Sequence, residues 1–399
     1  MQASREGWRV TAAAAAGVFC TTTFVLTFSI LLKPLADEFA WSREAVSSAF
    51  ASMTLATAVS APLVGHLVDR WGPRVVVGPL MLVAACAFTS LAALTPHLWH
   101  LYAIYALIGV AVPGNSPVVY SRVMASWFDR RRGVALSLVF ASAGVGAIVH
   151  PAIGHALVAA YGWRIACLLL GVVILAVGVP IVIRYVYEPP RIARVNADGR
   201  SGMVGAALRS RIFWTLITVV LGSTMVMSAM IVHLAALLTD RGIPATRAVA
   251  TVSTMGAASL LGRLLTGWLI DRFNATRVSC ALLTIAAIGT FLLAEDAPLS
   301  VAMIAAALVG FGTGGEVDVT PYLLSRYFGL RSLSTLYGLH WTAFGLSGAI
   351  GPVVMGRAFD ATRSYDAVLM VFAAVLVGTA ALMLTLPVYD RAPDAGSSG

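Results

Sequence analysis

The chain alternates between long apolar runs and short polar connections. Each run is about 20 residues long, which is enough to cross the hydrocarbon core of a bilayer. A helix is the expected conformation of each run, because every backbone polar group in lipid needs a partner within the segment. The pattern predicts an all-α membrane protein with twelve transmembrane helices, near residues 10–34, 45–68, 75–95, 98–120, 133–160, 164–186, 212–238, 246–270, 278–295, 298–322, 333–357 and 366–388.

One polar pattern occurs twice, half a chain apart. Gly-x-Leu-x-Asp-Arg stands at residues 65–70, after the second run, and again at residues 267–272, after the eighth. A further basic residue follows each copy, at Arg74 and at Arg277. A motif that recurs at matching places indicates an internal repeat. We therefore expect two pseudo-symmetric halves of six helices each.

The longest polar connection divides the chain into these halves. We expect an N-terminal half over residues 1–187, a cytoplasmic linker over 188–211 and a C-terminal half over 212–390. Residues 391–399 are polar and are expected to form a disordered tail. These segments leave no room for a soluble catalytic domain.

The composition is typical of a membrane protein. Hydrophobic residues make up 59% of the chain and charged residues only 11%, with a mean hydropathy of +0.87. Soluble domains carry about 25% charged residues. The net charge of +9 is therefore attributed to positive cytoplasmic loops, and no nucleic-acid partner is expected.

The basic residues also predict the orientation. Most of the 27 Lys and Arg residues fall on alternate connections, beginning with Arg5 and Arg9 before the first run. Cytoplasmic loops carry an excess of Lys and Arg, so both termini are predicted to be cytoplasmic. Lys33 is the only lysine. We interpret that bias as codon usage in a GC-rich bacterium, whose inner membrane would then hold the protein.

The sequence shows no pattern of a metal, cofactor or catalytic site. No histidine pair has ligand spacing with a third group beside it, and no nucleophile and base stand together. We expect no metal, no cofactor and no enzymatic activity, in a protein that acts as a monomer. Single cysteines within apolar runs form no CxxC pair, at Cys20, Cys86, Cys167 and Cys280.

Arg263 is the only charged residue in the middle of the run 246–270. A charged side chain at the bilayer centre costs about 2.5–3.5 kcal/mol on insertion scales. We interpret Arg263 as a clamp for a substrate carboxylate, because a guanidinium can donate two parallel N–H bonds to it. The alternative is a structural ion pair with Glu316 or Asp318.

Glu316 and Asp318 lie in the apolar run 298–322. Being two residues apart, they point in nearly opposite directions on a helix. One of them is a candidate for the proton-coupling group, since a desolvated carboxyl group can bind a proton. The alternatives are that both neutralise Arg263 or cap a glycine-weakened turn, and the sequence does not distinguish the two residues.

Four further polar residues are candidates for contact with an anionic substrate. His340, in the run 333–357, is the best candidate among the histidines. Asn115, Tyr120 and Tyr322 can donate hydrogen bonds to an anion. The alternative for each of the four is a structural role in helix packing.

Twelve runs, a central connection and the doubled motif resemble the major facilitator superfamily. The loop at residues 65–74 is similar to the signature of that family between its second and third helices. The resemblance covers nearly the whole chain and implies the major facilitator fold. It also implies that Asp69 and Asp271 belong to a cytoplasmic gate. Because both pairs recur at matching places in the two halves, we expect these aspartates to make charge-assisted contacts near Arg122 and Arg326 when the carrier is closed to the cytoplasm. The gate residues are expected to be Asp69, Arg70, Arg74, Arg122, Asp271, Arg272 and Arg326.

A narrower resemblance points to monocarboxylate transporters and the oxalate:formate exchanger. Residues 127–135 are similar to the monocarboxylate signature before the fifth helix, and residues 6–8 to a shortened form of the signature at its start. Arg263 falls where these transporters keep a substrate-binding arginine, and His340 falls about where the exchanger has a lysine. Ser259 stands where the monocarboxylate family has an acidic residue, so the coupling group must lie elsewhere.

These observations favour a secondary active transporter that moves a small organic anion by alternating access. A monocarboxylate is the favoured substrate and proton symport the favoured coupling. One alternative is a proton-driven exporter of amphiphilic compounds, but a cation exporter should show acidic groups without a central arginine. Another is a non-transporting membrane receptor, which predicts a large extramembrane domain.

Overall fold

The computed structural model describes residues 2–189, 203–295 and 298–389, and within these ranges the chain is helical and has no strand. The helices before residue 190 are α1 (Gln2–Leu26), α2 (Phe28–Phe39), α3 (Arg43–Trp71), α4 (Pro73–Ser90), α5 (Leu98–Ala111), α6 (Pro117–Trp127), α7 (Arg132–Val173) and α8 (Val179–Tyr185). The others are α10 (Met203–Leu208), α11 (Arg211–Asp240), α12 (Ala245–Arg272), α13 (Ala275–Ala294), α14 (Leu299–Tyr327), α15 (Leu333–Thr362) and α16 (Asp366–Leu384). The predicted tail 391–399 and most of the predicted linker lie outside the described residues.

The helices follow the predicted runs. In the described ranges, ten helical segments are long and apolar enough to cross a membrane. One of these segments, Arg132–Tyr185, contains two predicted runs. The chain turns between the two runs at Gly162, where φ is 79°. That left-handed conformation favours glycine, which has no Cβ atom. α15 adds a further helix of 30 residues, so the structure is consistent with the predicted twelve spans.

The chain divides into two units. Unit 1 comprises Met1–Phe128, Leu138–Met203 and Leu330–Thr342, and unit 2 comprises Asp129–Ser137, Val204–Gly329 and Ala343–Gly399. The beginning of α7 therefore belongs to unit 2 and the beginning of α15 to unit 1. The predicted boundaries of the halves at residues 187 and 212 stay predictions.

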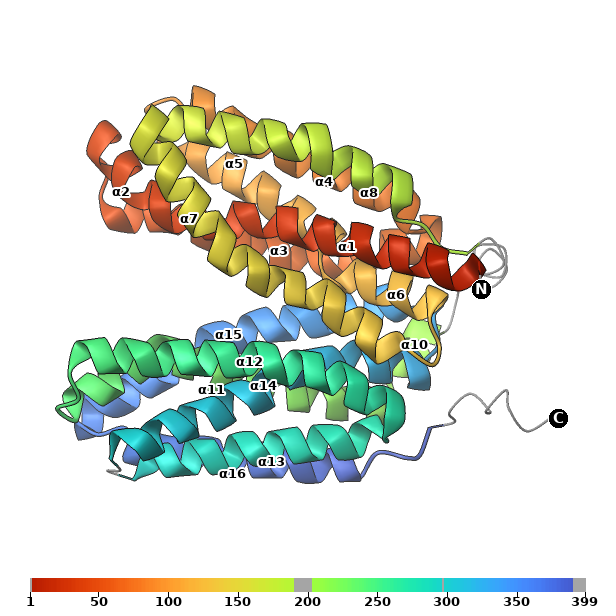
Figure 1. The fold of residues 1–399 in the computed structure, drawn as a ribbon, viewed down its shortest axis with the longest axis vertical. Helices are drawn as coiled ribbons and strands as arrows, with labels where there is room; N and C mark the ends of the chain where they lie inside the picture. The colour runs from red at the N-terminus through yellow and green to blue at the C-terminus, as the bar shows by residue number, and fades with distance from the viewer. Residues whose placement is uncertain (1, 190–202, 296–297, 390–399) are drawn as a thin grey trace. The chain divides into compact units, whose positions relative to one another are not determined.

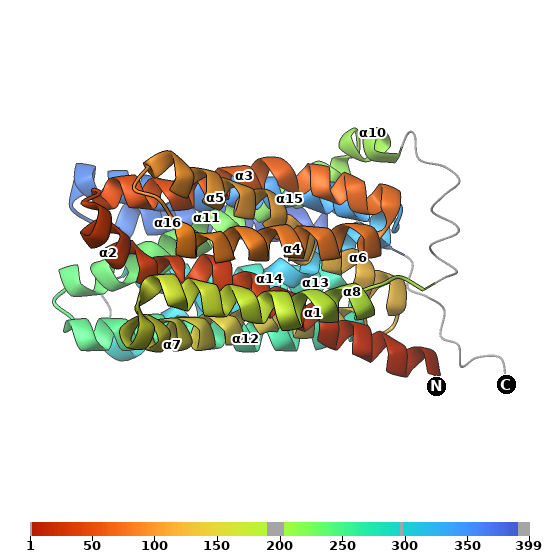
Figure 2. The same ribbon diagram turned by 90° about the horizontal axis from the view of Figure 1, so that it is seen from above.

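Aromatic side chains fill the core of unit 1. The rings of Phe24 in α1 and Phe88 in α4 lie 5.3 Å apart between centroids, and Phe28 of α2 meets Tyr105 of α5 edge-on at 5.1 Å. Such tilted ring contacts add to the gain from burying apolar area. Around this core, α5 lies beside α3 and α4, and α1 lies beside α8 (Figure 2).

In unit 2, α14 packs closely on two neighbours. It lies beside α12 and α13, and α13 also packs on α16 (Figure 1). A Cβ atom at Gly310 would overlap the carbonyl oxygen of Met255 in α12. A Cβ atom at Gly312 would overlap the carbonyl oxygen of Leu282 in α13. The glycines of α14 therefore let the backbones of α12 and α13 approach it on two sides. Glu316 and Asp318 follow these glycines on α14 and lie in this closely packed region.

Candidate functional site

Arg263 and Asp318 form an ion pair inside unit 2. Arg263 lies in the middle of α12 with 19% of its side chain exposed, and Asp318 of α14 is fully buried. The distance from Arg263 Nε to Asp318 Oδ1 is 3.7 Å. A charge-assisted hydrogen bond is about 2.7–2.9 Å long, so this contact is a loose one. The ion pair predicted as the alternative role of Arg263 is therefore present, with Asp318 as the partner.

Asp318 also contacts the beginning of α7. Its Oδ2 accepts a hydrogen bond from Ser137 Oγ at 2.9 Å. The Ser137 side chain lies where a Cβ atom on Gly267 of α12 would stand. One buried carboxylate thus contacts a cation on α12 and a hydroxyl group on α7. Sequence reasoning missed Ser137, because no local pattern links it to α14.

Glu316 contacts a different helix. Its Oε2 accepts a hydrogen bond from Ser279 Oγ of α13 at 2.6 Å. Within the described ranges, its Oε1 is buried and has no hydrogen-bond partner. The two acidic residues thus face different neighbours, as their spacing predicts: Asp318 faces Arg263, and Glu316 faces α13.

His340 is buried in unit 1. Its Nδ1 lies 2.9 Å from the carbonyl oxygen of Leu336, one turn earlier in α15. This contact lies within its own helix. Arg263 belongs to unit 2, so a substrate contact shared by the two residues stays a prediction.

Asn115 and Tyr120 hydrogen-bond to each other. Tyr120 Oη donates to Asn115 Oδ1 at 2.8 Å, and Asn115 Nδ2 donates to the carbonyl oxygen of Val77 at 3.1 Å. The Tyr120 hydroxyl also occupies the place of a Cβ atom on Gly17 of α1. Both side chains are buried and join α1, α4 and α6. These contacts are typical of helix packing, and a substrate role for either residue stays a prediction.

Tyr322 lies one turn after Asp318 on α14, near Arg326. The guanidinium carbon of Arg326 is 5.2 Å from the centre of the Tyr322 ring. Arg326 Nη2 also donates to Tyr322 Oη at 3.4 Å. Tyr322 therefore contacts the arginine at the C-terminal end of α14, and its role as a substrate contact stays a prediction.

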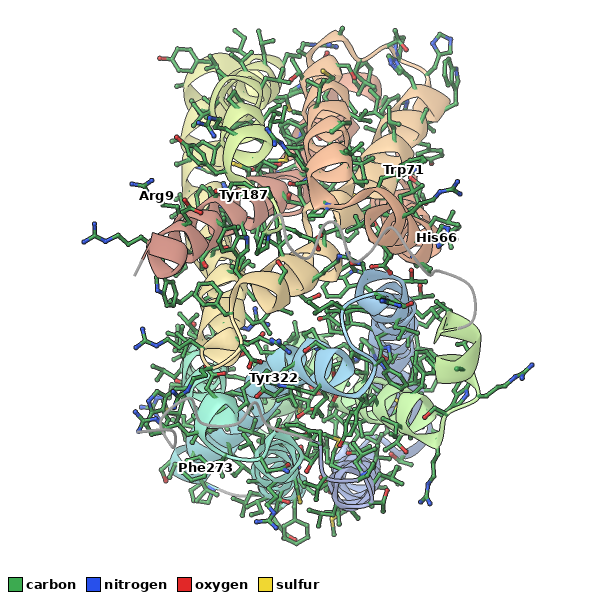
Figure 3. All side chains as sticks on the ribbon, turned by 90° about the vertical axis from the view of Figure 1, so that its right-hand side faces the viewer. Arg9, His66, Trp71, Tyr187, Phe273 and Tyr322 are labelled. Atoms are coloured by element: carbon green, nitrogen blue, oxygen red, sulfur yellow. The ribbon has the colours of Figure 1, made fainter. Side chains whose placement is uncertain are left out.

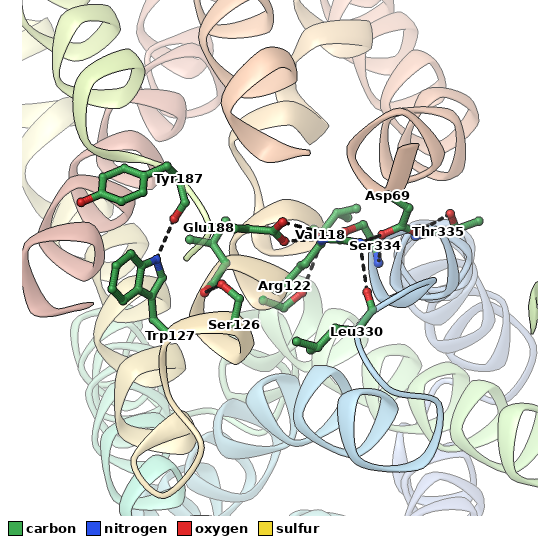
Figure 4. Close-up of polar contacts among 12 residues, drawn as sticks. Asp69, Val118, Arg122, Ser126, Trp127, Tyr187, Glu188, Leu330, Ser334 and Thr335 are labelled. Atoms are coloured by element: carbon green, nitrogen blue, oxygen red, sulfur yellow. Dashed lines mark hydrogen bonds and ion pairs between the residues drawn. The ribbon is translucent and has the colours of Figure 1, made fainter. Parts of the chain in front are cut away.

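Arg122 is the centre of a buried charge cluster in unit 1 (Figure 4). Its Nη1 donates to Asp69 Oδ1 at 2.6 Å, and its Nε donates to Glu188 Oε1 at 2.5 Å. The side chains are 1% exposed in Arg122, 8% in Asp69 and 4% in Glu188. The expected contact between Asp69 and Arg122 is confirmed. Sequence reasoning missed Glu188, which was assigned to the linker; its position directly after the sixth run was the available signal.

Asp69 also caps the N-terminus of α15. Its Oδ1 accepts a hydrogen bond from the backbone N–H of Ser334 at 3.2 Å, and its Oδ2 accepts one from that of Thr335 at 2.7 Å. The first N–H groups of a helix lack partners within it, and the helix dipole favours an anion there. A Cβ atom at Gly65 would overlap the Ser334 carbonyl oxygen. The glycine of the motif therefore permits the contact that its aspartate makes.

Asp271 repeats this arrangement in unit 2. Its carboxylate accepts hydrogen bonds from the backbone N–H groups of Gly133 at 2.7 Å and Val134 at 3.0 Å, in the first turn of α7. A Cβ atom at Gly267 would lie 2.6 Å from the Gly133 carbonyl oxygen. Figure 3 marks the ends of the two motif helices at Trp71 for α3 and just after α12 at Phe273. Both copies of the motif thus place an aspartate at the start of a helix.

Arg326 forms an ion pair with Asp129. Its Nη1 donates to Asp129 Oδ1 at 2.7 Å, and its Nη2 donates to the Asp129 carbonyl oxygen at 3.0 Å. The Asp271 carboxylate accepts hydrogen bonds from the backbone of α7, and Arg326 interacts with it electrostatically. Asp129 lies in the turn before α7, so it can reach the end of α14. Sequence reasoning missed this ion pair of Arg326 with Asp129, and the expected gate contact of Asp271 near Arg326 stays a prediction.

The other predicted gate residues are exposed. Arg70 and Arg74 lie at the surface around the turn between α3 and α4. Arg272 is exposed at the end of α12, where its guanidinium carbon lies 4.2 Å from the centre of the Trp268 ring. The gate role of all seven residues stays a prediction.

Metal-binding residue types are scattered in the described part of the chain. There, no group of three or more His, Cys, Asp and Glu side chains can hold a metal ion. The four cysteines are free thiols.

Proteins of similar sequence are membrane transporters. A family model for the Major Facilitator Superfamily matches residues 13–352. The chain is 23% identical to the uncharacterized MFS-type transporter YcxA of Bacillus subtilis (strain 168), with 92% of each chain covered. It is 23% identical to monocarboxylate transporter 12 of Homo sapiens, covering 94% of this chain and 81% of that protein. It is 25% identical to the oxalate:formate antiporter of Oxalobacter formigenes, covering 82% and 78%.

The fold matches solved transporter structures. A bacterial homologue of the iron transporter ferroportin, in its outward-facing state, superimposes with a TM-score of 0.74. The alignment covers 94% of this chain and 98% of that one, at 16% identity. At that identity the likeness concerns the fold alone.

Proposed function

Because the chain belongs to the Major Facilitator Superfamily and is a transporter rather than an enzyme, we propose that it carries a small organic anion across the membrane by alternating access. The proposed substrate is a monocarboxylate and the proposed coupling ion is the proton. The observation that carries the proposal is the pair of Arg263 and Asp318 in the middle of unit 2.

Arg263 suits a carboxylate ligand. Its side chain is 19% exposed, and its contact with Asp318 is 3.7 Å long. A carboxylate ligand can accept two parallel N–H bonds from it. Intramembrane ionisable residues are found where substrates or ions pass. A bound anion would therefore compete with Asp318 for the same cation.

The same competition supports proton coupling. In the empty carrier, the charges of Arg263 and Asp318 cancel. When a substrate carboxylate binds Arg263, the negative charge of the buried Asp318 is no longer compensated by its surroundings. An uncompensated buried charge has a high free-energy cost. A proton on Asp318 restores neutrality. One proton therefore accompanies each carboxylate, and the loaded carrier has the same charge at this site as the empty one. Glu316, which contacts α13, takes no part in this exchange.

The relatives support the substrate class. The names of two relatives specify monocarboxylates, oxalate and formate, which are all carboxylates. The segment at residues 127–135 is similar to the monocarboxylate signature. These similarities and the position of Arg263 point to the same chemistry.

We also propose the cellular setting. The distribution of arginines supports the inner membrane of a bacterium as the location, with both termini in the cytoplasm. In this proposal the protein acts as a monomer, and its partners are the organic anion, protons and the surrounding lipid.

Uptake into proteoliposomes tests the proposal. Purified full-length protein would be reconstituted, and labelled carboxylates added outside with and without an alkaline interior. We expect at least one monocarboxylate to accumulate under the pH gradient, and accumulation to collapse with a protonophore. Arg263→Ala vesicles and protein-free vesicles are the controls. Transport of amphiphilic cations but of no carboxylate would favour the exporter instead.

A further inference from the structure

Unit 2 contains a cavity of about 140 Å³ between α11, α12 and α14. Its walls are mainly methionine and aliphatic side chains. The Thr313 hydroxyl in the wall donates to the Val309 carbonyl oxygen at 2.7 Å, so its hydrogen is used within α14. The main lining residues are Met227, Ile231, Met255, Ser259, Val309 and Thr313.

This cavity adjoins Arg263. Ser259 in its wall precedes Arg263 by four residues on α12, and residues four apart are neighbours on one helix face, about 6 Å apart along the axis. Helical side chains lean toward the N-terminus of their helix, so Arg263 leans toward the turn that carries Ser259. An anion held at Arg263 therefore has the cavity directly beside it.

The cavity is open at Gly256. This residue lines the cavity and is exposed, and no atom lies within 4 Å of the place a Cβ atom would take. Gly256 precedes Arg263 by seven residues, two helical turns, and so shares its face of α12. The opening and the cation thus lie on one side of one helix.

We propose that this cavity receives the apolar tail of the anion whose carboxylate is held at Arg263, so that the substrate is a monocarboxylate with a tail of benzene size. This inference rests on the proposed function. An apolar cavity of about 150 Å³ in another protein binds one benzene molecule, which matches the volume here. Methionine sulfur makes favourable contacts with aromatic rings. A second carboxylate would be buried without a partner, so dicarboxylates are excluded.

Affinity should therefore depend on tail size with a sharp maximum. Each methylene group buried contributes about 0.8 kcal/mol, which is about a fourfold gain in affinity. Along the series acetate, 3-methylbutanoate and benzoate, affinity should rise by at least tenfold in total. It should fall again for 2-naphthoate, whose second ring exceeds the cavity, and succinate should bind no better than acetate.

Two variants and a matched control test the cavity itself. Gly256→Leu places a side chain in the opening and should weaken benzoate about tenfold or more, while acetate is unchanged. Gly378→Leu is the control, because Gly378 also lies exposed in a helix, α16, with no atom within 4 Å of its Cβ position. It should leave both affinities unchanged. Met227→Ala enlarges the cavity and should shift the preference toward 2-naphthoate.

Binding should be measured by titration calorimetry on purified full-length protein, with benzamide as the uncharged analogue of benzoate. The proposal is supported if carboxylate affinity depends on tail size in the unmodified protein and in Gly378→Leu, but no longer does so in Gly256→Leu. If carboxylates bind through Arg263 but tail size and Gly256→Leu have no effect, the cavity proposal fails and the proposed function survives. If benzamide binds as tightly as benzoate, or no carboxylate binds, both fail.

Discussion

The Nε atom of Arg263 lies 3.7 Å from Oδ1 of Asp318, and the other oxygen of this carboxylate accepts a hydrogen bond from Ser137. Asp318 thus contacts both the proposed substrate clamp on α12 and the beginning of α7. In the proposed mechanism, an anion that binds Arg263 changes the charge that Asp318 faces, and with it the hydrogen bond to α7. The proposal therefore links substrate binding, proton transfer and a helix contact through the Asp318 side chain.

Asp318→Asn should abolish gradient-driven accumulation while sparing exchange of labelled for unlabelled substrate. Asparagine cannot carry the coupling proton, whereas exchange returns a loaded carrier and needs no net proton release. Both modes can be measured in the same proteoliposome preparation. Glu316→Gln is the matched control, and we expect it to keep accumulation because Glu316 contacts Ser279 rather than Arg263. Full accumulation by Asp318→Asn would remove Asp318 from the coupling mechanism.

Asp69→Asn should slow turnover with little change in substrate affinity. The amide keeps an acceptor for the first turn of α15 but loses the charge that faces Arg122 and the helix dipole. Arg122 retains Glu188 as a partner, so the protein should still fold. The maximal rate and half-saturation concentration of uptake separate the two effects, with Arg209→Gln, an exposed arginine outside the predicted gate, as the control. A large loss of affinity at normal turnover would place Asp69 in substrate binding.

Arg122→Ala should destabilise the protein far more than Arg326→Ala. Removing one partner of a buried ion pair costs about 3–5 kcal/mol, and Arg122 leaves two buried carboxylates behind, which are 8% and 4% exposed. The partner of Arg326, Asp129, is 47% exposed, and exposed pairs contribute about 0–1 kcal/mol. Melting temperatures in one detergent compare the variants. Equal losses of melting temperature in the two variants would show that burial does not determine how much these ion pairs stabilise the protein.

The predicted orientation can be checked by cysteine labelling. In a protein without its four native cysteines, Arg209→Cys in the connection between the halves should react with a membrane-impermeant maleimide only from the cytoplasmic side. Thr95→Cys, exposed between α4 and α5, should react only from the opposite side. The reverse pattern would show that the orientation is opposite to the predicted one. Labelling of both positions from the same side would contradict the twelve-span topology.

The repeated apolar runs predicted the helices well, because a span needs a fixed length of apolar residues. The motif copies at Gly65 and Gly267 predicted matching loops, and both prove to bring an aspartate against the first turn of a helix. Local spacing also placed Glu316 and Asp318 on different sides of α14.

Partners that come from distant helices could not be predicted. Ser137 is 181 residues from Asp318, and no pattern of apolar positions relates α7 to α14. For the same reason the ion pair of Arg326 with Asp129 was not predicted, because it depends on the path of the turn before α7. The cavity beside Arg263 likewise lies between three helices whose packing no local pattern predicts, α11, α12 and α14.

In the proposed mechanism Arg263 binds the substrate carboxylate. Truncating one partner of a buried hydrogen-bonded charge pair costs about 2–5 kcal/mol, so Arg263→Ala should lower carboxylate affinity about 30-fold or more. Arg263→Lys should recover only part of it, because an ammonium group is a point charge without the planar fork. Asp318 would lose its cation in Arg263→Ala, so the double variant with Asp318→Asn serves as a second test.

The deciding measurement is carboxylate affinity on detergent-purified Arg263→Ala protein whose melting temperature matches that of the unmodified chain. We expect a loss of about 30-fold or more, partial recovery with lysine, and the same loss in the double variant with Asp318→Asn. Unchanged affinity in the well-folded Arg263→Ala protein would contradict it, since Arg263 would then serve only as the structural partner of Asp318.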